Sequence, residues 1–182
     1  TDFNHIIMTF SIKYLLNLVL FIMVTCLDTH TTQAQSLINK AERLYHQHQP
    51  HKAAKLYQQI MQSNTSKSDK TLAAKQLAYI EGHLYKHMAQ ARNWTAQGLK
   101  YQHNQSRLHQ NLADLEREHR QFTKGKIAAR LAVKTAQSKM DAFLANVTLC
   151  RIILEEQRNK LKNKQPLNPQ EIKMAQSIMV GI

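Results

Sequence analysis

Helix-breaking residues are scarce in this chain of 182 residues, which contains four Gly and three Pro. Both residue types interrupt regular structure, whereas the helix-favouring residues Ala, Leu, Gln, Lys and Arg are abundant. The composition therefore predicts an all-α protein. Even without its first 34 residues the chain is long enough for one domain with a real core.

Recognisable catalytic motifs are also lacking. The chain has no Gly-rich phosphate loop, no nucleophile elbow, no HExxH zinc motif and no CxxC pair. Glu155 and Glu156 are adjacent, so on a helix their carboxylates point to different sides and are poorly placed to act together as general acid and general base. We therefore expect a non-enzymatic protein without a catalytic site, a cofactor or a bound metal.

The chain lacks an apolar run of ordinary membrane-spanning length. Residues 14–27 form an apolar run of 14 residues, whereas a membrane-spanning helix needs about 20. This length, with small residues at Thr32 and Ala34, predicts a signal peptide over residues 1–34 that is cleaved after Ala34. Two alternatives stay open, an uncleaved N-terminal anchor and a lipoprotein modified at Cys26. We expect an exported protein that is periplasmic or membrane-associated.

Cysteine is nearly absent, with two residues in the chain. If Cys26 leaves with the signal peptide, Cys150 is alone and no intramolecular disulfide can form. Cys150 shares an apolar helical face with Val147 and Leu154, which predicts a buried, inert thiol rather than a nucleophile.

Acidic residues are few, because 12 Asp and Glu stand against 25 Lys and Arg, for a net charge of +13. Without residues 1–34 the chain has 24 basic and 10 acidic residues, a net charge of +14. Part of this charge forms a basic stripe of six residues, Arg117, Arg120, Lys124, Lys126, Arg130 and Lys134. The stripe could contact nucleic-acid phosphates, acidic lipid head groups or an acidic partner, or it could be a solvated helix face. Export and the absence of interleaved aromatic residues argue against nucleic acid.

The clearest amphipathic pattern lies over residues 37–61. Apolar residues recur at helical spacing on both sides of Gln49 and Pro50. Pro50 fixes its own backbone and disfavours a helical conformation at Gln49, so the pattern predicts two short helices folded back on each other here. Such a pair cannot bury its apolar face alone and needs a partner surface from the rest of the chain.

This pair resembles the tetratricopeptide repeat (TPR), a helix–turn–helix unit of about 34 residues. The resemblance places Leu37 at the Trp position, Ala41 at the Gly position, Leu44 at the first Tyr position, Ala53 at the Ala position and Tyr57 at the Phe position. Small side chains at Ala41 and Ala53 would let the two helix axes approach to about 8–10 Å. The Gln-rich stretch TTQAQ before the pair is similar in style to exported proteins of Bacteroidetes.

The chain departs from the TPR pattern at Lys40, His48 and Thr65, where the family has Leu, Gly and Pro. One repeat length beyond Ala41 and Ala53 it carries Lys75 and His87, so the small residues do not recur in register. We therefore expect one clear repeat within a TPR-like region over residues 35–92.

A third helix is predicted from Thr71 to Arg92, and beyond it the apolar pattern changes to steps of seven. One series runs Trp94, Tyr101, Leu108, Leu115, Phe122, and a second runs Val133, Met140, Val147, Leu154, Leu161. With Gly125 as a helix end between them, these series predict a long antiparallel helical hairpin over residues 93–163. Gly98 makes the first seam imperfect, which favours packing in a bundle over a free coiled coil.

The last region, residues 164–182, contains a fresh helix start. Asn168 is predicted to cap this short helix, Pro169 to be its first residue and Glu171 to complete a capping box. One side of the helix is apolar, with Ile172, Ala175, Ile178 and Met179. We expect this side to cover the end of the core rather than to form an exposed docking strip.

Ten His residues raise the question of a metal site. His83 and His87 are four residues apart, and His46, His48 and His51 cluster at the first hairpin turn, spacings at which imidazoles can share Zn²⁺. No Cys or tight carboxylate set joins them, and their neighbours are mostly Gln, Lys and Asn. A solvated surface is therefore the favoured interpretation, and we predict no metal site.

These observations favour a non-enzymatic helical scaffold of the bacterial envelope that binds another protein. The TPR resemblance implies a ligand groove lined by the first helix of the hairpin, with Asn39 as a clamp on peptide backbone. It assigns partner binding to Ile38, Asn39, Glu42, Tyr45 and His46. Two alternatives are a basic helical nucleic-acid-binding module and the sensor portion of a larger TPR-containing envelope regulator.

Overall fold

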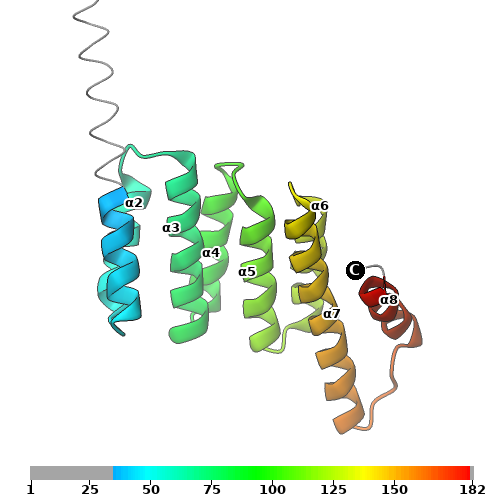
Figure 1. Cartoon of the computed structure of the whole chain (residues 1–182). Coiled ribbons are helices and arrows are strands. Elements are labelled where there is room, and N and C mark those ends of the chain that lie inside the picture. The colour runs from blue at the N-terminus through cyan, green and yellow to red at the C-terminus, as the bar shows by residue number, and fades with distance from the viewer. Residues whose placement is uncertain (1–34, 181–182) are drawn as a thin grey trace, which may run out of the picture.

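The computed structural model describes residues 35–180, which form helices joined by short loops and contain no β-strand (Figure 1). The prediction of an all-α protein is confirmed. The predicted export signal over residues 1–34 lies outside the described residues. Within residues 35–180, no helix combines the length and the apolar character that crossing a membrane requires.

The described helices are short, apart from one. The first described helical stretch covers residues 35–46. It is followed by α2 (Pro50–Gln62), α3 (Lys67–Tyr79), the π-helical segment η1 (Ile80–Leu84), α4 (Met88–Leu99), α5 (Gln105–Glu118), α6 (Phe122–Lys134), the long α7 (Lys139–Lys162) and α8 (Pro169–Val180).

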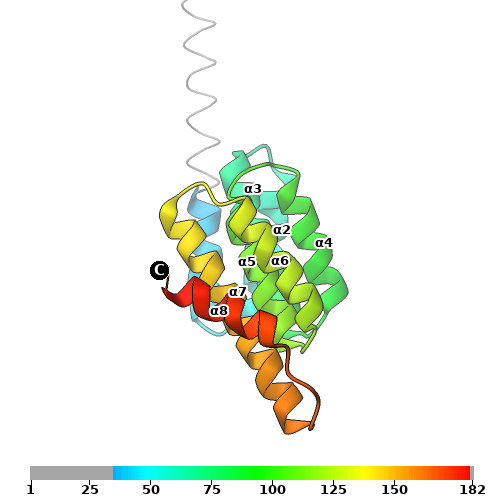
Figure 2. The ribbon, with the colours of Figure 1, turned by 90° about the vertical axis from the view of Figure 1, so that its right-hand side faces the viewer.

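Successive helices form pairs that stand side by side in one row (Figure 1). The pair of residues 35–46 with α2 lies at one end, and α3 with α4, α5 with α6, and α7 with α8 follow. α3 packs on α2 and α5, and α5 packs on α4 and α7, so each pair covers an apolar face that the preceding pair leaves open. Viewed from the far end of the row, α8 crosses α7 obliquely (Figure 2).

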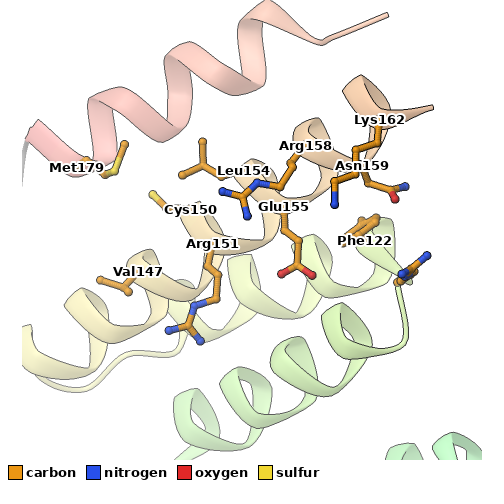
Figure 3. Close-up of a pocket in the computed structure, with 11 residues that line it drawn as sticks. Phe122, Val147, Cys150, Arg151, Leu154, Glu155, Arg158, Asn159, Lys162 and Met179 are labelled. Atoms are coloured by element: carbon orange, nitrogen blue, oxygen red, sulfur yellow. The ribbon is translucent and has the colours of Figure 1, made fainter. Parts of the chain in front are cut away.

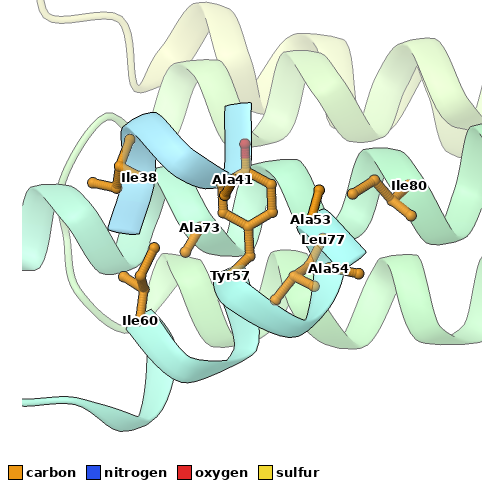
Figure 4. Packing of buried hydrophobic residues seen from close by; sticks show 9 residues of the cluster. All are labelled: Ile38, Ala41, Ala53, Ala54, Tyr57, Ile60, Ala73, Leu77 and Ile80. Carbon is orange, nitrogen blue, oxygen red and sulfur yellow. The ribbon is translucent and has the colours of Figure 1, made fainter. Parts of the chain in front are cut away.

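The predicted helical hairpin over residues 37–61 is present. Pro50 is the first residue of α2, and Ala41 and Ala53 are both fully buried. They pack with Tyr57, whose ring lies at the centre of the first hydrophobic cluster (Figure 4). Ala73, Leu77 and Ile80 complete this cluster from the next helices, so the partner surface that the hairpin needs comes from α3 and η1.

The helix predicted from Thr71 to Arg92 is interrupted, and this part of the prediction is wrong. The α-helix gives way to η1, and Lys86 then takes a left-handed conformation with φ of 61° before α4 begins at Met88. The chain therefore turns back, and α3 and α4 form a second pair. The fully buried alanines of this pair are Ala73, Ala74, Ala78 and Ala91, and none of them lies one repeat length after Ala41 or Ala53.

The long helical hairpin predicted over residues 93–163 is also wrong. Its expected first helix is divided among α4, α5 and the start of α6, and α7 is the only long helix in the range. Gln102 and Asn104 are left-handed in the loop after α4, and Arg120 is left-handed in the loop after α5, with φ of 52°, 46° and 57°. The first series of sevens continues across these loops because its members lie in different helices. The expected helix end at Gly125 is an interior position of α6.

The three described glycines lie inside helices, where their lack of a side chain permits close packing. A Cβ on Gly98 of α4 would lie 2.9 Å from the Cβ of Ala74 in α3 and 3.1 Å from the Cδ atoms of Leu108 in α5. A Cβ on Gly125 would lie 3.3 Å from the carbonyl oxygen of Ala113. Ordinary contacts between carbon atoms are about 3.5–4.0 Å. These glycines therefore set how closely neighbouring helices approach.

The start of α8 agrees with two of its three predicted features. The Asn168 side-chain oxygen accepts hydrogen bonds from the backbone N–H groups of Gln170 (3.1 Å) and Glu171 (3.3 Å), and Pro169 is the first helical residue. The capping box is wrong, because the Asn168 N–H donates to Oε1 of Gln157 at 2.8 Å. The Glu171 carboxylate instead accepts from Gln157 Nε2 at 3.0 Å and pairs with a lysine of α6.

The apolar side of α8 covers the end of the core, as predicted, except for Met179, which is 50% exposed. Ala175 is fully buried, and Met174 and Ile178 pack on the same cluster. The Cys150 thiol lies 3.6 Å from the Ala175 carbonyl oxygen and is buried, so the prediction of a buried cysteine is confirmed. Burial raises the pKa of this thiol, which disfavours the reactive thiolate.

Candidate functional site

The five residues predicted to bind a partner do not form one surface. Ile38 is 3% exposed and belongs to the first hydrophobic cluster, so its assignment to partner binding is wrong. Asn39 and His46 are exposed, and Glu42 and Tyr45 are half-buried. The Asn39 side-chain oxygen accepts a hydrogen bond from Gln35 Nε2 at 3.1 Å, a local contact within one helix.

Tyr45 alone among the five lines a groove on the row. The groove has a volume of about 390 Å³ and is built by residues 35–46 together with α3 and α5. Its lining residues are Tyr45, Lys75, Gln76, Tyr79, Arg107, Gln110, Asn111 and Asp114. The first helices of three successive pairs therefore contribute to one concave site.

Aromatic rings form one wall of this groove. The rings of Tyr45 and Tyr79 meet edge to face, with centroids 6.3 Å apart and an interplanar angle of 73°. Behind Tyr79, the ring of His83 stacks at 4.8 Å. Burial and the neighbouring Tyr45 raise the pKa of the Tyr79 hydroxyl, which favours its neutral form.

Lys75 is the cation of the groove without a carboxylate partner. Arg107 donates to Asp141 at 2.8 Å, and Asp114 lies between Arg117 at 3.5 Å and Arg151 at 3.7 Å. No carboxylate among residues 35–180 lies within 4 Å of the Lys75 ammonium. Burial lowers the pKa of Lys75, the positive charge of Arg107 lowers it further, and Glu42 opposes the shift. A bound anion would stabilise the charged ammonium.

Amide side chains complete the site. Gln110 Nε2 donates to the carbonyl oxygen of Leu144 and to Oγ1 of Thr148, both at 3.2 Å, and Asn111 Nδ2 lies 3.4 Å from the carbonyl oxygen of Lys75. These bonds hold α3, α5 and α7 together. They also fix both amides at the groove, where their oxygens can accept hydrogen bonds from a ligand backbone.

The predicted basic stripe is divided between two environments. Arg120, Lys124, Arg130 and Lys134 are exposed. Arg117 donates to Glu155 at 2.8 Å, and Lys126 binds Glu156 at 2.6 Å and Glu171 at 2.5 Å. The prediction of one continuous stripe is therefore wrong, because α6 turns Lys126 towards α7 and α8 while its other basic residues face solvent.

Lys126 links three helices. Burial lowers the pKa of its ammonium, but the hydrogen bonds and charges of Glu156 and Glu171 outweigh burial and raise it. The two carboxylates belong to α7 and α8, so the ammonium joins both helices to α6. A second ion pair, with a buried carboxylate, joins α4 to α5, where Arg92 binds both oxygens of Glu116 at 2.6 and 2.9 Å.

Two of the five histidines considered as metal ligands, His83 and His87, have carboxylate partners. Nδ1 of His83 lies 2.6 Å from Glu118, and Nδ1 of His87 lies 3.0 Å from Glu81. In the described part of the chain, no three His, Cys, Asp or Glu side chains gather as a metal site would require.

Most residues of the groove beside Tyr45 were not predicted from the sequence to bind a partner. Lys75, Tyr79, Arg107 and Asn111 come from α3 and α5, and which of their faces point into the groove depends on where the loops turn the chain. Comparison with known proteins adds no candidate, because no family model, no curated protein and no solved structure matches this chain.

Proposed function

We propose that this protein is a non-enzymatic helical scaffold, related in design to TPR proteins, that binds a segment of another protein in the groove beside Tyr45. Two observations support the proposal. The chain stacks helix pairs in a row, an architecture that creates extended concave binding surfaces. The resemblance of residues 37–61 to a TPR unit agrees with that use of the fold.

The observation that carries the proposal is the chemistry of the groove. Aromatic rings supply apolar contact area at low cost in conformational entropy, and the amides can bind peptide backbone. Lys75 supplies a positive charge without a carboxylate partner. The ligand best suited to this set is an extended segment with one acidic side chain near an apolar one.

Selection from a library of displayed peptides tests this assignment. We expect enrichment of peptides that contain Asp or Glu, and we expect Lys75→Met and Tyr79→Ala to weaken their binding at least about tenfold. His51→Ala is the matched control, because His51 is exposed on α2 and lies outside the groove lining. Equal loss of affinity in the control, or peptides that bind all three variants like the wild type, would remove the groove assignment.

Our proposal places the scaffold in the bacterial envelope, because the apolar run over residues 14–27 has the length of a signal peptide. Mass spectrometry of the N-terminus after expression in a bacterial host tests this part separately. A protein that begins at Gln35 supports export with cleavage. A protein that retains residues 1–34 in the cytoplasm would contradict it.

Nucleic-acid binding has weaker support. Two of the six residues of the predicted stripe, Arg117 and Lys126, are engaged by carboxylates of the chain itself. The four exposed cations give fewer phosphate contacts than the sequence implied, so we expect weak binding with a shallower salt dependence than six contacts would give.

A further inference from the structure

A second groove runs along α7 (Figure 3). It has a volume of about 600 Å³ and lies between α8 and the turn that joins α5 to α6. Its floor is apolar, with Val147, Leu154 and Met179 from α7 and α8, and Phe122 contributes from the start of α6. No residue of this groove lines the groove beside Tyr45.

The floor belongs to a longer apolar seam on α7. Met140, Leu154 and Leu161 are 61%, 43% and 66% exposed, and they recur in steps of seven with Val147. Phe143, one turn after Met140, is 40% exposed. Apolar residues at this spacing along a helix are the pattern that a second helix covers when it lies alongside. Within residues 35–180, α8 covers the neighbouring face of α7 and leaves this seam open.

The charges beside the seam identify the chemistry of an occupant. Arg120, Arg158 and Lys162 border the groove, and no carboxylate among the described residues lies within 4 Å of their charged groups. The acidic residue of the groove, Glu155, is bound by Arg117 at 2.8 Å. Two copies of this surface would bring cations against cations, so charge opposes pairing through α7 with a second copy of the chain.

We propose that the seam on α7 is a docking site for an amphipathic helix of another protein, with apolar residues at heptad spacing and acidic residues on both flanks. The apolar residues of that helix would cover Val147, Leu154 and Leu161. Its carboxylates would pair with Arg158 and Lys162 on one side and with Arg120 on the other. This site would be additional to the groove beside Tyr45, so the two can be tested independently.

A designed peptide provides a defined probe. The peptide is a helix of about three heptads with Leu at both apolar positions and Glu at the flanking positions. Its matched counterpart carries Lys in place of every flanking Glu. We expect the full chain to bind the acidic peptide at least about tenfold more tightly than the basic one in fluorescence anisotropy, with an affinity that falls as salt rises.

Exposed positions allow variants that preserve the fold. Leu154→Glu and Arg158→Glu should each weaken binding of the acidic peptide about tenfold or more. Ile127→Glu is the control, because Ile127 is 54% exposed on α6 and lies outside the groove. Tyr79→Ala, which tests the first groove, should leave this affinity unchanged. Circular dichroism establishes that each variant is folded.

Three results would overturn the proposal. One is equal binding of the acidic and basic peptides, or binding that Leu154→Glu does not weaken. Another is sedimentation of the wild type as a dimer that Leu154→Glu dissociates, which would assign the seam to a second copy. The third is binding of anionic phosphatidylglycerol vesicles that depends on Leu154 while neither peptide binds, which would assign it to a lipid surface.

Discussion

Replacement of Gly98 by Ala tests how closely the helix pairs are packed. Two effects oppose each other at this position. Ala favours a helix over Gly by about 1 kcal/mol in a helix interior. The added methyl would lie 2.9 Å from the Ala74 Cβ, which is attached directly to the α3 backbone, and 3.1 Å from the Leu108 Cδ atoms. The Ala74 Cβ cannot move aside without α3 itself.

The steric effect should prevail. Adding a methylene to a packed core costs about 1–3 kcal/mol. With about 1 kcal/mol of helix propensity in the other direction, we expect Gly98→Ala to lower the free energy of unfolding by about 1 kcal/mol. For a chain of this size that lowers Tm by about 2–4 °C. Urea unfolding followed by far-UV circular dichroism measures the free energy, and a thermal scan measures Tm.

A double-mutant cycle with Ala74 separates the two effects. Ala74→Gly removes the methyl that Gly98→Ala would meet, so the double variant again has one methyl between α3 and α4. We expect the two changes together to cost about 1–2 kcal/mol less than the sum of the single changes. A stabilisation of about 1 kcal/mol by Gly98→Ala, or a coupling within about 0.3 kcal/mol of zero, would refute the reasoning that contact limits this position.

Three further predictions concern ionisable groups that are buried or that pair with a buried group. Arg92→Ala should lower the free energy of unfolding by about 2–3 kcal/mol, because the Glu116 carboxylate, which is 3% exposed, loses its bidentate partner. Urea denaturation measures this change, and a loss below about 0.5 kcal/mol would contradict the prediction. Burial lowers the pKa of His109, so its contribution to stability is full above about pH 6.5 and is lost as pH falls. His109→Gln should therefore flatten the decline of stability between about pH 7.5 and 5.5, and an unchanged slope would count against burial as the cause. Lys126→Met should speed hydrogen exchange in α8 and lower the free energy of unfolding by about 3 kcal/mol. Lys160→Met is the control, because it removes only a longer ion pair within α7 and should lower that free energy by about 0.5 kcal/mol or less.

The first hairpin could be predicted from the sequence because its signals are local. Pro50 fixes the break, and Ala41 and Ala53 mark the face on which the two helices touch. The start of α8 was predicted for the same reason, since Asn168 and Pro169 form a cap within a few residues. Local backbone chemistry and small residues at a contact are both visible in a one-dimensional pattern.

The loops between later helices could not be predicted in this way. Left-handed residues end or separate these helices at Lys86, Gln102 and Arg120, where a sequence pattern anticipates Gly. The glycines lie inside helices instead, as Gly125 does in α6. Tertiary packing therefore determined both the corners and the glycine positions, and the first series of sevens predicts one long helix where several short helices form.

Most residues of the groove beside Tyr45 could not be predicted, because their positions depend on the loops at these corners. Tyr45 was predicted because it lies in the first helix of the hairpin, but Arg107 comes to the groove only after the chain has turned at Lys86 and again at Gln102. Glu171 shows the same dependence on tertiary structure. Its position favours a local capping box, yet the buried ammonium of Lys126 binds its carboxylate.

Two loops between helices of the row offer a way to raise the thermal stability of the protein. A non-glycine residue in the left-handed region lowers the stability of the folded state by about 1–2 kcal/mol. Lys86 and Gln102 both adopt this conformation on exposed loops. Glycine would relieve that strain, and its greater freedom in the unfolded chain would offset about 0.4–1 kcal/mol of the gain. A version of this protein with glycine at both corners should therefore tolerate higher temperature while both grooves keep their side chains.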